Sequence, residues 1–344
     1  MKRGGALKRG RALGSGRARL LLAPLAIFFL FQAAGAQDGT GRFMYLRGEI
    51  VSPAYEGWWP NQDGSFTLFF GYMNSNWEQD FEVPIGPDNY FALTEPGGLD
   101  DLEREALDPA VADQGQPAHF YPRRKPFLFT LRVPGDFGDK EWVWTLTTQG
   151  KTNRAYGLLS SDYRIDPQVM STEAGGNFGS LDDRLRTNLP PELEAEGDEY
   201  RSVRTGEPLT LVVFANDPDN FPARREDGRG DPPSTLEELY RGPGGSTVQG
   251  APGLRFSWMV YRGPARHVSF APLQMKTWMD SRVWSNSPWS PPRMVPEPPA
   301  NGRWVTEVTF DEPGEYVLRG VAGDGSSFTY ENVIVTVTPR PALL

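Results

Sequence analysis

The sequence predicts an all-β protein built from two antiparallel β-sandwich domains. Where the chain is regular, apolar residues alternate with polar ones at a period of two, and the apolar positions are rich in aromatic and β-branched residues. Strand-like segments occur in two regions, separated by a stretch from 166 to 205 that lacks this periodicity. Because successive side chains leave opposite faces of a strand, the alternation indicates half-buried antiparallel sheets.

The first region, residues 37–165, is predicted to form one sandwich interrupted by an irregular loop at 94–125. Its predicted core positions, taken from three alternating segments, are Phe66, Leu68, Phe70, Tyr72, Phe127, Phe129, Leu131, Val133, Trp142, Trp144 and Leu146. The Asp63-Gly64 pair predicts a hairpin turn or tight loop before one strand. Inside the loop, residues 98–111 predict one short helix that ends at Pro109.

The first 36 residues have the order of a secretory signal peptide. Seven Lys or Arg residues without an acid precede an apolar run at 20–31, and small residues at Ala34 and Ala36 follow it. The run of 12 apolar residues is shorter than the roughly 20 that a membrane-spanning helix needs. We therefore expect cleavage after Ala36 and export to the periplasm or the extracellular space, with no membrane span after cleavage.

Charge and composition exclude several classes of function. Without its first 36 residues the chain keeps 28 of its 35 basic residues and all 44 acidic ones, a net charge near −16. Nucleic acids and anionic membranes attract basic surfaces, so neither is expected as a partner. The absence of cysteine rules out disulfides, thiolate catalysis and iron–sulfur clusters, and no cofactor is predicted.

The stretch 166–205 is rich in Gly, Pro and acidic residues, which predicts a linker between the domains. After it, residues 206–340 contain five strand-like segments separated by turns, as expected for a second sandwich. Two insertions, at 217–252 and 271–301, are much longer than a usual sandwich loop.

The second region resembles bacterial immunoglobulin-like and PKD-like domains. Its tail at 308–337 has a Pro-Gly turn, then Tyr316 on the next strand, then an Asp-Gly turn, as the closing strands of such domains do. The resemblance implies an immunoglobulin-like sandwich with Trp258 as its core tryptophan. In the first region, "YEGWWPNQDGSFTLFFGYMNSN", "VPIGPDNYF" and "DQGQPAHFYPRR" are similar to an uncharacterised family of exported bacterial proteins, and this resemblance implies no activity.

The segment 113–124 places His119 next to an arginine pair. Imidazole titrates near neutral pH, so His119 is a candidate base, while Arg123 and Arg124 could bind an anion or a carboxylate. A catalytic base needs a nucleophile and an orienting partner, and the sequence has no serine-hydrolase signature. We therefore interpret the segment as a shaped loop that packs over a sheet edge, with an arginine paired to an acid. Ligand binding by these three residues is the alternative.

Residues 216–220 are a weak candidate calcium site. Asp217, Asp219 and Asn220 offer hard oxygen ligands at the end of a predicted strand, but not in the order of an EF-hand loop. Such clusters are more often solvated turns. The two histidines of the chain fall in different predicted domains and lack zinc-ligand spacing, so a histidine zinc site is not expected.

The second insertion carries three tryptophans, Trp278, Trp284 and Trp289, among Pro and Ser residues. Exposed aromatic side chains on a loop can stack on sugar rings or fill a pocket of a protein partner. Alternatively, the three side chains could fold back and cap the core of their own sandwich.

These patterns predict an exported, non-enzymatic binding or interaction protein of the bacterial envelope or extracellular space, with a protein or a glycan as its partner. One alternative is a carbohydrate-binding module that uses the loop aromatics. The other is a hydrolase, since glycosidases need only two suitably placed carboxylates. The acidic residues available to it in the 94–125 loop are Asp100, Asp101, Glu103, Glu105, Asp108 and Asp113.

Overall fold

Strands make up nearly all the regular structure of the computed structural model, which confirms the predicted all-β class. It describes residues 47–76, 78–96, 108–174, 183–221, 223, 253–274 and 298–341. Residues 45–344 belong to one compact unit. The predicted signal peptide lies outside the described residues, and no helix in the described part is long and apolar enough to cross a membrane.

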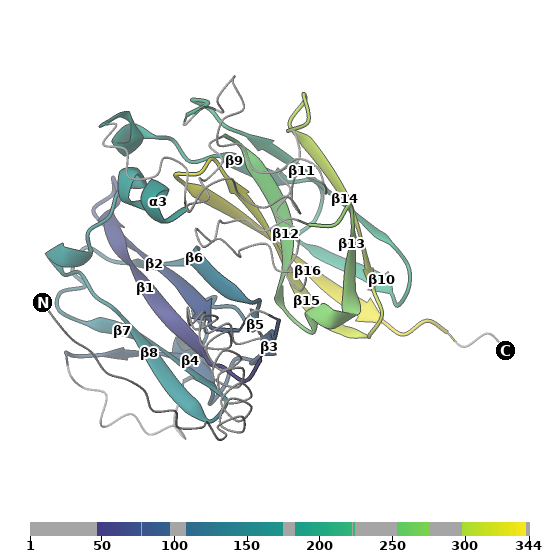
Figure 1. Ribbon diagram of the computed structural model, residues 1–344, viewed down its shortest axis with the longest axis horizontal. Helices are drawn as coiled ribbons and strands as arrows, with labels where there is room; N and C mark the ends of the chain where they lie inside the picture. The colour runs from purple at the N-terminus through teal and green to yellow at the C-terminus, as the bar shows by residue number, and fades with distance from the viewer. Residues whose placement is uncertain are drawn as a thin grey trace, which may run out of the picture. The chain divides into compact units, whose positions relative to one another are not determined.

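The first sandwich consists of two three-stranded antiparallel sheets and a small two-stranded one (Figure 1). The first sheet has the order β1-β2-β6, with β1 at Val51–Pro60, β2 at Phe66–Asn74 and β6 at Arg123–Val133. The second has the order β4-β7-β8, with β4 at Asn89–Thr94, β7 at Glu141–Thr148 and β8 at Lys151–Gly157. Strands β3 (Phe81–Glu82) and β5 (His119–Phe120) form the small sheet. The hairpin predicted at Asp63-Gly64 joins β1 to β2.

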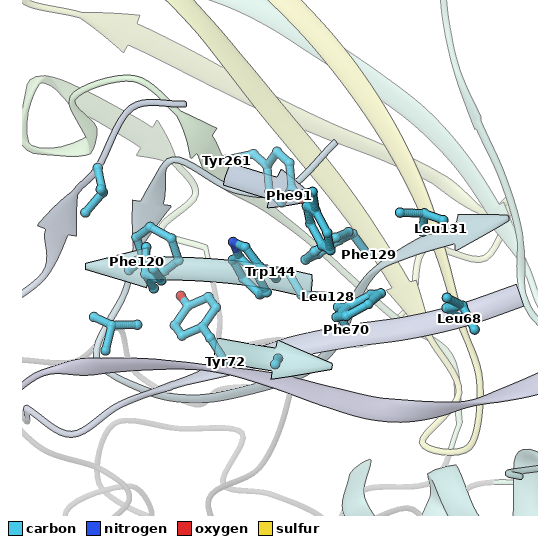
Figure 2. Packing of buried hydrophobic residues seen from close by; sticks show 14 of the residues in the cluster. Leu68, Phe70, Tyr72, Phe91, Phe120, Leu128, Phe129, Leu131, Trp144 and Tyr261 are labelled. Carbon is cyan, nitrogen blue, oxygen red and sulfur yellow. The ribbon is translucent and has the colours of Figure 1, made fainter. Parts of the chain in front are cut away.

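Aromatic side chains fill the space between the two three-stranded sheets, as Figure 2 shows. Phe70 on β2 stacks on Phe129 of the neighbouring strand, with ring centroids 5.5 Å apart. From the opposite sheet, Phe91 meets Phe70 edge-on at 5.2 Å and stacks on Trp144 at 5.9 Å. The core face predicted for residues 65–73 is therefore confirmed.

A bulge in β6 makes the prediction wrong at one core position, Phe127. Residues 126–128 of β6 oppose the single residue Gly71 on β2, and Phe127 has a φ of 48°. The bulge interrupts the alternation locally, so Leu128 enters the main core while Phe127 joins a separate buried cluster, and the alternation resumes at Phe129. A Cβ on Gly71 would come within 2.3 Å of the Lys125 carbonyl oxygen, so only glycine fits beneath the bulge.

The second sandwich has two four-stranded sheets (Figure 1). One has the order β13-β14-β11-β9, with β13 at Val268–Ala271, β14 at Arg303–Phe310, β11 at Leu209–Asn216 and β9 at Glu192–Ala195. The other has the order β10-β16-β15-β12, with β10 at Tyr200–Arg204, β16 at Phe328–Thr338, β15 at Gly314–Gly323 and β12 at Arg255–Arg262. Every pair is antiparallel except β10 with β16, which is parallel.

This strand order is that of an immunoglobulin-like sandwich. The sheets β9-β11-β14-β13 and β12-β15-β16 correspond to the two sheets of that fold, and β9 and β10 are successive segments in opposite sheets. Trp258 on β12 is 2% exposed and lies in the core, as predicted. The Tyr316 hydroxyl donates to the Glu312 carbonyl oxygen at 2.9 Å, which is the tyrosine corner of immunoglobulin domains.

The stretch 166–205 contains more structure than the predicted linker. Helix α3 (Pro167–Ala174) and the 3-10 helix η4 (Asp183–Thr187) come first, and β9 and β10 follow. The second sandwich therefore starts at Glu192 and not at residue 206. In the 94–125 loop, Pro109 begins the four-residue helix α2 (Pro109–Ala112), since proline is well suited to the first helical turn. The rest of the helix predicted at 98–111 lies outside the described residues.

One face of the sheet β10-β16-β15-β12 packs against the first sandwich. Met259, Tyr261 and Val321 of this sheet belong to the same buried cluster as the core of the first sandwich. Phe328 stacks on Phe127 of the β6 bulge, with ring centroids 6.3 Å apart. The segment 113–124, which leads into β6, also contacts the second sandwich.

Candidate functional site

The segment 113–124 lies along β12, an edge strand of the second sandwich. The Ala118 amide donates to the Tyr261 carbonyl oxygen at 3.0 Å, and the Val260 amide donates to the Tyr121 hydroxyl at 3.1 Å. An uncovered edge strand exposes unpaired backbone groups, so these bonds protect β12 from unwanted pairing. The segment is thus a shaped loop over a sheet edge, as the sequence indicates.

An ion pair fixes the start of this loop. Arg262 on β12 places its two terminal nitrogens 2.9 and 2.7 Å from the two carboxylate oxygens of Asp113, and its Nε donates to the Gln116 carbonyl oxygen at 3.0 Å. The hydrogen bond from Arg262 holds the pKa of Asp113 below its usual value. Fork-shaped contacts of this kind fix orientation as well as distance.

Two of the six carboxylates considered for a hydrolase lie in the described residues, and both have structural partners. Asp113 pairs with Arg262, and Asp108 Oδ1 accepts the Ala110 amide at 2.9 Å as the cap of α2. The other four, at positions 100–105, lie outside the described residues.

His119 on β5 is 3% exposed. Its Nε2 lies 3.3 Å from Asp80 Oδ2, and its ring meets the Tyr121 ring edge-on at 4.5 Å. The contact with His119 holds the pKa of Asp80 below its usual value and outweighs the effect of burial. The imidazole is therefore a packed side chain beside a carboxylate and is not presented to solvent.

The two arginines that follow have partners within the first sandwich. Arg124 makes a two-point contact with Glu56, at 2.7 and 2.5 Å, so one arginine is paired with an acid as the sequence indicates. Arg123 is 3% exposed, has a φ of 70° and donates to the Ser75 carbonyl oxygen at 2.7 Å. A ligand would have to compete with these contacts, and ligand binding by His119, Arg123 and Arg124 stays a prediction.

Both long insertions leave the second sandwich at one end, which we call the loop end. The first follows Asn216 at the end of β11 and returns to Arg255 at the start of β12; the second runs from the end of β13 to Arg303 at the start of β14. The register pairs Phe214 with Arg303 and Arg255 with Gly323. The turn between β15 and β16 therefore lies at the same end.

Backbone hydrogen bonds join the roots of these loops to the sandwich. The Gly253 amide, before β12, donates to the Asp324 carbonyl oxygen in the β15–β16 turn at 2.9 Å. The Ala215 amide on β11 donates to the Gly302 carbonyl oxygen, before β14, also at 2.9 Å. The points from which the insertions depart are thus fixed by the sheets.

A buried carboxylate, Asp324, organises the base of the loop end. It is 0% exposed and accepts the Ser326 and Ser327 amides at 2.5 and 2.7 Å. The Asn188 side chain donates to its second oxygen at 2.9 Å. Burial raises the pKa of Asp324, while these hydrogen bonds and the charge of Arg255 oppose the rise.

Arg255 is 3% exposed, and in the described part of the chain none of its three guanidinium nitrogens has a hydrogen-bond partner. Burial lowers its pKa to about 10, and the charge of Asp324 acts in the opposite direction. Sequence reasoning missed Asn188, Arg255 and Asp324. An arginine in a strand usually faces solvent, so the sequence of β12 predicts that Arg255 is exposed. Only the packing of the folded sheet shows that it is buried.

The candidate calcium ligands lie beside this base. Asp217 Oδ1 accepts the Asn220 amide at 3.1 Å, and Asp219 Oδ2 accepts the Leu189 amide at 3.0 Å. Burial raises the pKa of Asp217 to about 7, helped by its contact with Asp219 and by the charge of Asp324. Among the described residues, no group of three or more acidic or histidine residues is arranged to hold a metal ion, and calcium binding stays a prediction.

Trp278, Trp284 and Trp289 lie outside the described residues. The structure places only the two ends of their insertion, at residues 271–274 and 298–303. Binding of a partner by these side chains, and its alternative of capping the core, stay predictions.

The fold defines a protein of two β-sandwiches, the second immunoglobulin-like. No family model matches the chain, and no curated protein matches it. Fibronectin(III)-like modules of Clostridium thermocellum CbhA are similar at a TM-score of 0.21 and 9% identity, over 84% of this chain and 95% of that one. The Yersinia pseudotuberculosis adhesin InvE is similar at a TM-score of 0.20 and 12% identity, over 83% of this chain and 58% of that one. The D00-D0 domain of Intimin is similar at a TM-score of 0.20 and 7% identity, over 83% and 100%. The immunoglobulin-like character of the second sandwich rests on its sheet topology.

Proposed function

We propose that the chain is an exported, non-enzymatic binding protein whose partner contacts the loop end of the second sandwich. The observation that carries this proposal is the departure of both long insertions from one end of an immunoglobulin-like sandwich, beside the β15–β16 turn. Loops gathered at one end of such a sandwich are its usual binding surface, because the sheets hold them in place while their sequences vary.

Several observations support a binding role over a catalytic one. His119 is buried beside Asp80, Arg124 is paired with Glu56, and Asp113 is paired with Arg262. These groups stabilise the fold, whereas a catalytic base must reach a substrate. The signal-like N-terminus supports export, and the net charge near −16 favours a protein or glycan partner over nucleic acid.

The test is replacement of residues 275–297, and separately of residues 224–252, by a short Gly-Ser linker in the full chain. Binding is then measured against immobilised glycans and against proteins of the producing cell's envelope and medium. We expect the loop replacements to lose binding that a Tyr200→Ala control retains, since Tyr200 is 70% exposed on β10. Retention of binding by both loop variants would contradict the proposal, and loss in the glycan arm would identify the partner as a carbohydrate.

A further inference from the structure

The first sandwich has an open pocket of about 410 Å³ beside the β3–β5 pair, in which Glu82 lies opposite His119. Residues 81–88, which run from β3 toward β4, form most of its wall, and residues 147–149, at the end of β7 and the start of the turn to β8, complete it. This volume is within the range of natural small-ligand sites.

A fully buried side chain, Asn89, fixes the wall of this pocket. Its amide nitrogen donates to the carbonyl oxygens of Val83 at 2.9 Å and Pro117 at 2.8 Å. Its oxygen accepts the indole N–H of Trp144 at 2.9 Å. Because Asn89 is 0% exposed and ties three chain segments together, the backbone that lines the pocket has little freedom to move.

Backbone bonds close the rest of the wall. Gly86 and Asn89 exchange two hydrogen bonds of 3.0 Å, which makes a tight turn with Asp88 near its tip. The Thr147 amide donates to the Asp88 carbonyl oxygen at 2.8 Å, and the Val51 amide donates to Thr148 Oγ1 at 2.9 Å. A ligand would thus meet a preformed pocket, which reduces the entropy lost on binding.

The lining combines apolar and acidic groups. Phe81, which also packs against the main core, and Ile85 are half-buried at the wall, and Glu82 and Asp88 are exposed. The lining contains no Lys, Arg or His. Neither carboxylate makes an ion pair within the part of the chain that the structure describes. The pocket is therefore complementary to a cation with an apolar stem.

We infer that this pocket binds a lysine or arginine side chain presented by a protein partner. The methylene stem lies against Phe81 and Ile85, and the charged head lies near Glu82 and Asp88, as long basic side chains commonly divide between apolar and polar surroundings. This site is on the first sandwich and does not depend on binding at the loop end.

The test is a titration of the isotope-labelled full chain followed by the backbone amide signals of Gly86 and Gln149. The probe is N-acetyl-lysine methylamide, and its matched neutral control is N-acetyl-norleucine methylamide. We expect saturable shifts with a roughly millimolar Kd for the lysine probe alone, as suits so small a ligand. A Glu82→Gln/Asp88→Asn variant should bind about tenfold more weakly, whereas Asp139→Asn, at an exposed turn, should bind as the parent does.

Equal shifts with the norleucine probe, or unchanged affinity in the Glu82→Gln/Asp88→Asn variant, would overturn the inference. A second arm compares cadaverine with a Gly-Gly-Lys-Gly-Gly peptide capped at both ends. Tighter binding of the peptide supports a protein partner, because the Gly86–Asp88 wall can then also contact peptide backbone. Binding of cadaverine as tight as that of the peptide would overturn the protein partner in favour of a small free cation.

Discussion

Arg319 on β15 donates a hydrogen bond from Nη1 to the carbonyl oxygen of Leu128 on β6, at 2.8 Å. The same guanidinium donates from Nε to Asn332 Oδ1 at 2.9 Å and lies 3.6 Å from the centroid of the Tyr261 ring. Arg319 is only 7% exposed. A buried cation of the second sandwich is thus stabilised by backbone of the first and by aromatic rings of its own sheet.

Replacement of Arg319 by Met should lower the free energy of unfolding by about 2 to 4 kcal/mol, because the Leu128 carbonyl and Asn332 lose a charged donor in a buried setting. Urea unfolding followed by tryptophan fluorescence measures the loss. Arg204→Met is the control, because Arg204 is mostly exposed and its ion pair with Glu207, at 4.0 Å, is long and weak. A loss no larger than that of the control would show that the contact contributes little.

Asp217 should make stability depend on pH between about 4 and 7. Its pKa rises from 3.8 in the unfolded chain to about 7 in the folded one, so the folded state holds a proton that the unfolded state releases. Stability therefore falls as pH rises through this window. Asp217→Asn should be more stable than the parent at pH 8, by about 1 kcal/mol once solvent screening of this half-buried group is allowed for, and nearly equal to it at pH 4. Parallel pH profiles for the two proteins would contradict this.

N-terminal sequencing of the protein recovered outside the cytoplasm should begin at or very near Gln37. The expectation follows from the charged, apolar and small-residue order of the first 36 residues. An uncleaved chain recovered from membranes would contradict export by signal cleavage.

Brief proteolysis should cut first within residues 166–205 and leave two fragments, because this stretch is dense in Gly, Pro and acidic residues. We expect the cut before Glu192, since β9 and β10 pair within the sheets of the second sandwich. Fragment masses locate the cut. First cuts inside residues 43–165 would argue against a domain boundary here.

Side-chain alternation was enough to predict the core of β2, where Leu68, Phe70 and Tyr72 are all fully buried. It failed at Phe127, because a bulge changes the face of the bulged residues and depends on the partner strand, here at Gly71. It also missed β9, because in this four-residue edge strand only Leu193 and Ala195 face the core, and two apolar residues are too short a pattern to detect.

Of the loop end, the sequence predicted only that the second sandwich carries two long insertions. Their departure from a common end follows from strand pairing, which a single sequence does not state. The burial of Arg255 and Asp324 depends on what covers the sheet, so no local pattern marks these residues. The role of Asp113, by contrast, was open between catalysis and structure until Arg262, 149 residues away, was placed beside it.

Alanine variants of Trp278, Trp284 and Trp289, made one at a time in the full chain, test most directly whether the loop end binds a partner. Each variant is assayed for thermal unfolding and for binding to the glycan or protein partner. If the loop end is a binding surface, the free energy of unfolding should change by no more than about 0.5 kcal/mol while binding weakens. A loss of roughly 3 to 5 kcal/mol in all three variants would mean that the tryptophans cap the core, and it would contradict their role in binding.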